Sequence, residues 1–163
     1  MKIILSLIVV LLVAILVIFL VKKRKDSQLK KKQKEYEYLV TKSMRESLGQ
    51  VKIAGFNGSE VSFDSATISP VSKVWGLNVV VFDYSFSAID LDKEQVNHIR
   101  GELKSKLEKF AREKDLTMDN GRCPLVVSDM WSRKGKLNVE VAYLINEETL
   151  GYVHDLKRID NNK

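Results

Sequence analysis

Residues 3–21 read IILSLIVVLLVAILVIFLV, nineteen residues in which Ser6 is the only polar side chain and none is charged. A helix of this length spans roughly 28 Å, about the thickness of the hydrocarbon core of a bilayer. The four cations that follow at residues 22–25 are typical of a stop-transfer signal, and no small-residue cleavage pattern precedes them. The sequence therefore predicts an uncleaved transmembrane anchor over residues 1–21.

The basic residues of the chain gather directly after this stretch. Because cationic flanks stay on the cytoplasmic side, they predict a single-pass cell-membrane protein whose N-terminus lies outside and whose C-terminal domain is cytoplasmic. The alternative is an outward-facing domain on an uncleaved signal anchor. In either topology these side chains are expected to contact the lipid bilayer, including its anionic headgroups. They are Lys22, Lys23, Arg24, Lys25, Lys30, Lys31, Lys32 and Lys34.

The rest of the chain is close to neutral and forms one domain. Of the 163 residues, those numbered 35–163 carry eighteen cations and twenty anions, so the overall charge of +6 comes from the membrane flank. This distribution argues against nucleic acid as a partner. Cys123 is the only cysteine, which excludes a disulfide within the chain. We expect an anchor at 1–21, a basic juxtamembrane stalk and helix at 22–48, and a globular domain at 49–163.

Two helices are predicted after the anchor. Apolar residues at helical spacing indicate a helix over residues 26–48 that ends before Gly49. Its part from residue 36 to 48 is expected either to dock on the domain or to form a homodimer. The second helix begins after Asp92, which with Gln95 makes the pattern of a capping box. Its apolar stripe consists of Val96, Ile99, Leu103, Leu107 and Phe110, with Ala111 beside it.

Strands account for most of the remaining sequence. Asn57-Gly58 lies between two alternating runs and predicts a hairpin over residues 51–63. The run 74–88 is β-rich and is expected to be the central strand. Further strands are expected at 66–69, 125–131 and 137–145, with a bulged turn at Gly135 and an edge strand in the tail at 149–156. The predicted class is therefore α+β, a mostly antiparallel sheet of about five strands with one long helix on one face.

No catalytic, cofactor-binding or metal-binding motif is present in the sequence, so we expect a protein that is not an enzyme and has no cofactor. A small membrane-tethered hydrolase would use Cys123, with His98 or His154 as its base, or the carboxylates, and nothing in the sequence brings Cys123 and the histidines together. Asp83, Asp90 and Asp92 offer oxygen ligands near one strand-to-helix junction, but Asp92 is better explained as a cap. The candidate partner contact is the hairpin tip formed by Trp131, Arg133, Lys134 and Lys136, since Trp and Arg are enriched at binding hot spots.

These observations predict a non-catalytic interaction or scaffold domain, presented in the cytoplasm by a single-span anchor as an accessory part of a membrane-associated assembly. The partner would be another protein, which the sequence does not identify. An extracytoplasmic binding module on a signal anchor is the alternative, and a tethered hydrolase is the third possibility.

Overall fold

A computed structural model of the chain describes residues 2–71, 76, 78–87, 91–118 and 120–161, and the side chains of all of these except residues 2–10, 13 and 159–161. Over this part the fold is α+β, as the sequence predicted, and it consists of three α-helices and two antiparallel sheets. In chain order the elements are α1 (Lys2–Leu48), β1 (Lys52–Ile53), β2 (Phe56–Asn57), the 3-10 helix η1 (Gly58–Glu60), β3 (Thr67–Pro70), β4 (Val81–Ser87), α3 (Lys93–Glu113), β5 (Leu125–Arg133), β6 (Lys136–Tyr143) and α4 (Glu147–Asn161).

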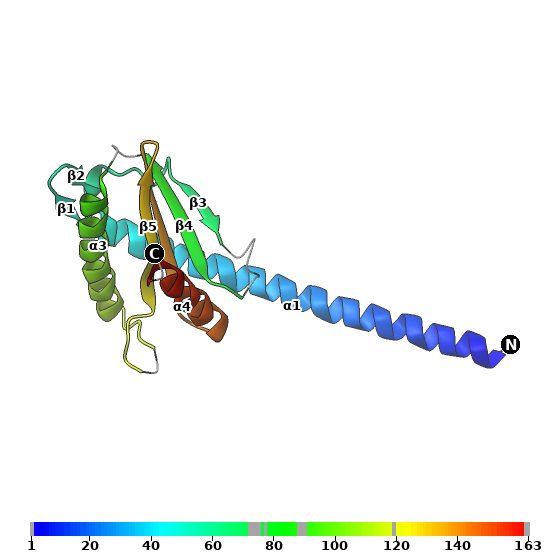
Figure 1. The fold of residues 1–163 in the computed structure, drawn as a ribbon. Helices are drawn as coiled ribbons and strands as arrows, with labels where there is room; N and C mark the ends of the chain where they lie inside the picture. Colours follow the sequence, from blue (N-terminus) through cyan, green and yellow to red (C-terminus); the bar gives the residue numbers. More distant parts are fainter. Residues whose placement is uncertain (1, 72–75, 77, 88–90, 119, 162–163) are drawn as a thin grey trace.

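The main sheet has four described strands in the order β3-β4-β6-β5, all antiparallel (Figure 1). The C-terminal part of α1 and the whole of α3 cover one face, and α4 covers the other. The predicted sheet of about five strands with one covering helix therefore needs correction. The remaining two strands, β1 and β2, form a separate small sheet, and the main sheet is packed on both sides.

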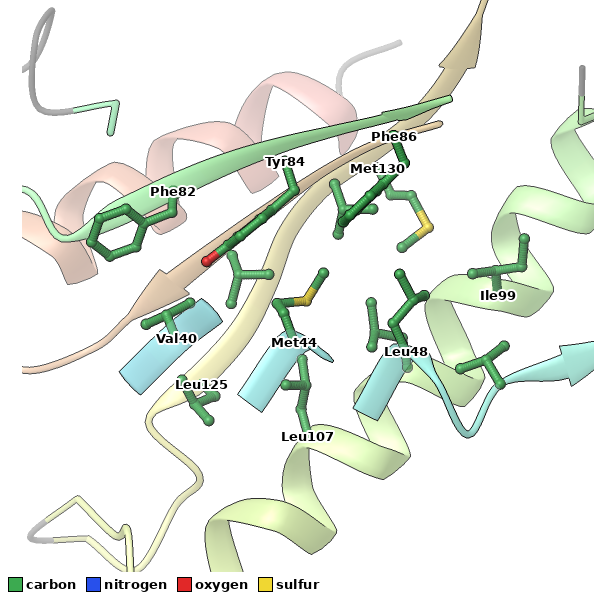
Figure 2. Packing of buried hydrophobic residues seen from close by; sticks show 14 of the residues in the cluster. Val40, Met44, Leu48, Phe82, Tyr84, Phe86, Ile99, Leu107, Leu125 and Met130 are labelled. Atoms are coloured by element: carbon green, nitrogen blue, oxygen red, sulfur yellow. The ribbon is translucent and has the colours of Figure 1, made fainter. Parts of the chain in front are cut away.

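The core follows from the alternation of side chains along the strands. Phe82, Tyr84 and Phe86 of β4 point toward α1 and α3, where they meet Val40, Met44 and Leu48 of α1 (Figure 2). Val81, which precedes Phe82, points to the opposite face, where it packs with Val79, Ala142 and Val153 under α4. β4 thus has an apolar side chain on both faces near its start, and residues 79–86 show the predicted facing pattern.

Helix α3 forms as its sequence predicts. Asp92 accepts a hydrogen bond from the Gln95 backbone N–H at 2.8 Å, and Gln95 Oε1 accepts one from the Asp92 backbone N–H at 3.1 Å. This reciprocal pair completes the capping box. The buried residues of α3 are those of the predicted stripe: Val96, Ile99, Leu103, Leu107, Phe110 and Ala111.

Helix α1 is continuous from Lys2 to Leu48 and extends far beyond the rest of the fold (Figure 1). Among the residues that the structure describes, no helix combines the length and the apolar character needed to cross a membrane. The expected span at residues 3–21 includes residues 3–10 and 13, whose side chains are outside the described set, so the anchor stays a prediction. The end of α1 docks on the sheet, where Val40, Met44 and Leu48 are fully buried.

The turn of the hairpin predicted at residues 51–63 lies at a different position from the predicted one. The two short strands pair Lys52 with Asn57 and Ile53 with Phe56, so the turn lies at Ala54-Gly55, where Gly55 has a φ of 80°. Asn57 instead caps η1, since its side chain accepts a hydrogen bond from the Ser59 N–H. Gly58 is required for a different reason, because a Cβ built there would overlap the carbonyl oxygen of Leu48.

Two other strand predictions also need correction. The predicted strand at 74–88 forms only as β4; its positions 74, 75, 77 and 88 lie outside the described residues, and residues 78–80 precede the strand. The tail at 149–156 is not an edge strand but part of α4. Asn146 acts as its N-terminal cap by accepting a hydrogen bond from the Thr149 N–H at 2.9 Å.

The β5–β6 hairpin forms where predicted but with a tighter turn. Arg133 pairs with Lys136, which leaves only Lys134 and Gly135 in the loop, with φ values of 53° and 68°. Two successive left-handed residues make a type I′ turn rather than the predicted bulged turn. The irregularity lies instead inside β5, between Val127 and Asp129.

Candidate anion-binding groove

A groove of about 580 Å³ lies between α3, the start of β5 and the C-terminal part of α4. Its apolar lining includes Ala111, Leu116, Leu125, Val126 and Val127. Its polar lining is rich in cations: Arg100, Lys104, Arg112, Arg122 and Lys157, opposed by Glu108. This volume is within the range of ordinary ligand sites, and an apolar floor with a charged rim can orient a bound molecule.

Most of these cations form no ion pair within the part of the chain that the structure describes. Lys104, Arg112, Arg122 and Lys157 are exposed and form no ion pair with any side chain that the structure describes. Glu108 lies four residues from both Lys104 and Arg112 on α3 but is not within ion-pair distance of either. The groove therefore keeps a local excess of positive charge in a domain that is otherwise slightly acidic.

Arg100 differs from the other four cations because it is fixed in place. Its guanidinium donates to Asp129 Oδ1 at 3.1 Å and to the Met130 carbonyl at 3.0 Å. The Nε atom of the same side chain is buried and makes no hydrogen bond with a described residue. Arg100 therefore attaches α3 to the edge strand β5 and fixes one wall of the groove.

The floor of the groove is the edge of the sheet. β5 is the last strand in the order β3-β4-β6-β5, and no described strand pairs with its outer side. The Leu144 N–H donates to the Pro124 carbonyl at 2.8 Å, whereas the Tyr143 N–H donates to the Val80 carbonyl at 2.9 Å. Since antiparallel pairs alternate, the polar backbone groups of Leu125 and Val127 point away from β6, toward the groove.

The irregularity at Ser128 limits this open edge to a short stretch. Ser128 donates its hydroxyl to the Glu140 carbonyl at 3.1 Å and to Glu140 Oε1 at 2.9 Å. An extra residue at this point bends the strand, so an added strand could not continue regular pairing past it. The regular part of the exposed edge therefore covers residues 125–127, next to the cations of α3.

Cys123 lines the same groove but has the properties of a structural thiol. Its Sγ donates to the Leu125 carbonyl at 3.3 Å, and burial raises the pKa of the thiol. A reactive cysteine requires the opposite shift. His98 and His154 are both exposed, and neither makes a hydrogen bond with Cys123 among the described residues. The arrangement does not assemble the nucleophile and base that a hydrolase would need.

A row of carboxylates crosses the opposite face of the sheet. Glu140 lies between Asp83 on β4 and Asp129 on β5, which are its neighbours in the two ladders. Glu140 accepts hydrogen bonds from Ser128 and from the Tyr152 hydroxyl. Burial, followed by repulsion within the row, raises the pKa values of Glu140 and Asp83.

This row is not the oxygen cluster that the sequence suggested. Asp92 caps α3, and Asp90 lies outside the described residues. No group of three or more potential ligands in the described part of the chain is arranged to hold a metal ion. Asp83 therefore belongs with Glu140 and Asp129, a set whose strand pairing could not be inferred from the sequence.

The other predicted contact residues lie on the surface. The eight cations of the stalk are all exposed along α1. At the tip of the β5–β6 hairpin, Trp131 is 37% exposed and Arg133, Lys134 and Lys136 are exposed beside it. The groove was missed by sequence reasoning, because its cations come from α3, the 116–123 loop and α4.

The comparisons with known proteins leave function to be argued from these features alone. No protein-family model, curated protein or solved structure is significantly similar to this chain.

Proposed function

We propose that this chain is a single-span membrane protein that presents a non-catalytic α+β interaction domain in the cytoplasm, as an accessory part of a membrane-associated assembly. The observation that carries the proposal is the continuity of α1. One helix contains the apolar stretch 3–21, the cationic stretch 22–34 and the buried residues Val40, Met44 and Leu48.

This continuity gives the helix a mechanical role. Between Val21 and Tyr36, the first residue of α1 that packs against the core, the helix rises roughly 22 Å. A helix that is part of the core at one end and of the bilayer at the other would hold the domain at a fixed height above the headgroups. The exposed lysines and arginine of the stalk support this arrangement, since each contributes about 1 kcal/mol of attraction to an anionic surface.

A homodimer through residues 36–48 remains part of the proposal in a restricted form. The face with Val40, Met44 and Leu48 is covered by the sheet and α3, so a second copy would have to use the outer face of α1. Tyr38, which is 72% exposed, lies on this outer face.

The raised pKa of the Cys123 thiol and the absence of a catalytic motif in the sequence support a binding role over hydrolysis. The outward-facing binding module is the alternative that shares every feature of the domain. Topology separates the two, because the proposal places residues 35–163 inside the cell.

A cysteine at an exposed position tests the topology. In a Cys123→Ser background, Lys52→Cys on the exposed face of β1 is expected to resist a membrane-impermeant maleimide in intact cells and to react after the cells are opened. Resistance of the chain to carbonate extraction reports the anchor independently. Labelling in intact cells would contradict the cytoplasmic assignment and favour the outward-facing module, and extraction by carbonate would contradict the anchor.

A further inference from the structure

We propose that the groove between α3 and α4 binds an extended acidic peptide segment of a partner protein, which pairs as an additional strand with β5 at residues 125–127. This inference rests on the proposed function, because it identifies the chemistry of the partner that the interaction domain would bind. Three independent features support it: an open strand edge, an apolar floor, and rim cations that form no ion pair with a side chain that the structure describes.

The strand edge supplies the backbone contacts. The outward N–H groups of Leu125 and Val127 and the outward carbonyl of Val127 can bond an added strand, as in other cases of β-strand addition, whereas the Leu125 carbonyl already accepts from Cys123 Sγ. The three strand residues 125–127 before the irregularity at Ser128 correspond to about 10 Å of pairing.

The rim determines which peptide fits. Lys104, Arg112 and Arg122 stand on the α3 side of the groove, and Lys157 stands on the α4 side. Side chains of an added strand alternate between these two sides. Acidic residues on the α3 side would meet Lys104, Arg112 and Arg122, and the apolar residues between them would face the α4 side beside Val126. Among the described residues that line the groove, Glu108 is the one anion, and it opposes part of this attraction.

The test uses the full-length protein in nanodiscs of phosphatidylcholine, a lipid without net charge. The probe is a fluorescein-labelled octapeptide of alternating glutamate and valine, and binding is followed by fluorescence anisotropy. The double variant Lys104→Glu with Arg112→Glu should weaken binding at least about tenfold, because like charges then face the peptide. Lys52→Glu with Lys93→Glu makes the same change in net charge at exposed positions outside the groove and should change affinity less than about twofold. Equal losses in both double variants would overturn the proposal.

Two further measurements separate strand addition from general attraction between opposite charges. Methylating alternate backbone nitrogens of the probe removes the donors on one edge but no charge, and in one of the two alternate sets it should abolish binding. Equal binding of both methylated sets and the parent peptide would exclude strand pairing. Inorganic phosphate at the ionic strength of a sodium chloride control should compete no better than chloride, and strong competition would mean that the groove is a site for small anions instead.

The variant Glu108→Gln tests the effect of groove charge on peptide binding in the opposite direction. It removes an anion that lines the groove and should tighten peptide binding, whereas Glu94→Gln, at an exposed position near the start of α3, should not. Thermal unfolding of each variant verifies that the domain is folded. Failure of peptide binding in a protein that resists carbonate extraction would contradict this inference alone and leave the anchor in place.

Discussion

The Tyr152 hydroxyl donates a hydrogen bond to Glu140 Oε1 at 2.8 Å and so attaches α4 to the centre of the sheet. Glu140 is only 8% exposed and lies between two other carboxylates, Asp83 and Asp129. Burial is the main reason why its pKa is raised above the ordinary value of 4.5, while the bonds from Tyr152 and Ser128 act in the opposite direction. The contact is therefore a compromise between a useful hydrogen bond and an unfavourable buried charge.

Replacing Glu140 with glutamine should stabilise the protein at neutral pH. The amide oxygen keeps the acceptor for Tyr152 and Ser128, and the buried charge is removed, for an expected gain on the order of 1 kcal/mol. Because the pKa of Glu140 is raised on folding, its contribution to stability is fully present below pH 4.5 and is lost as pH rises through the folded-state value. The gain of Glu140→Gln should therefore shrink as the solution is acidified.

Thermal unfolding of the two proteins at several pH values between 4 and 7 checks this expectation. Glu46→Gln, at an exposed position on α1, is the control and should behave like the parent protein. A variant less stable than the parent by the same amount at every pH would show that the carboxylate is needed for packing rather than tolerated as a charge.

Leu103→Ala measures how firmly α3 is packed on the sheet. Leu103 is fully buried in the middle of the apolar stripe, so truncation should lower the free energy of unfolding by about 2–5 kcal/mol. Ser105→Ala, two residues away on the exposed side, should change it by less than about 0.5 kcal/mol. Chemical denaturation gives both values, and similar small changes for the two variants would mean that the helix is not held there.

The part of the fold that the sequence predicts well is the part in which local signals are sufficient. Asp92, Gln95 and the stripe from Val96 to Phe110 specify α3 because capping and helical periodicity involve neighbours in sequence. The prediction of a hairpin turn at Asn57-Gly58 was wrong because a tertiary contact decides the conformation there. Gly58 is needed against Leu48, which belongs to another element.

The tail and the groove were missed for different reasons. Asn146 and Thr149 form a cap that the sequence does display, although the tail at 149–156 was expected to be an edge strand. The groove has no local signature, since it depends on the position of β5 at the sheet edge and on the packing of α3 beside it. Charges such as Arg112 and Lys157, far apart in sequence, acquire a common role only when the chain is folded.

Gly58 and Gly101 lie in different environments, so replacing each with alanine should change the stability in opposite directions. Gly58→Ala should lower the stability by about 1–3 kcal/mol or more, because the new Cβ overlaps the backbone of Leu48. Gly101 lies inside α3 with open space where a Cβ would be, so Gly101→Ala should raise the stability by about 0.5–1 kcal/mol. Urea denaturation of both variants distinguishes the two cases, and a neutral Gly58→Ala would contradict the close approach of η1 to α1.

The last prediction concerns where the folded domain begins. Deleting residues 1–34 removes the apolar and cationic parts of α1 but none of the α1 side chains that the structure describes as buried, so the remaining protein should be soluble and should unfold cooperatively. Deleting residues 1–48 also removes Val40, Met44 and Leu48, three fully buried side chains. Each would cost about 2–5 kcal/mol if truncated singly, which together exceeds the net stability of many domains. The shorter protein should therefore show no cooperative transition in calorimetry, and one that did would place the C-terminal end of α1 outside the folding unit.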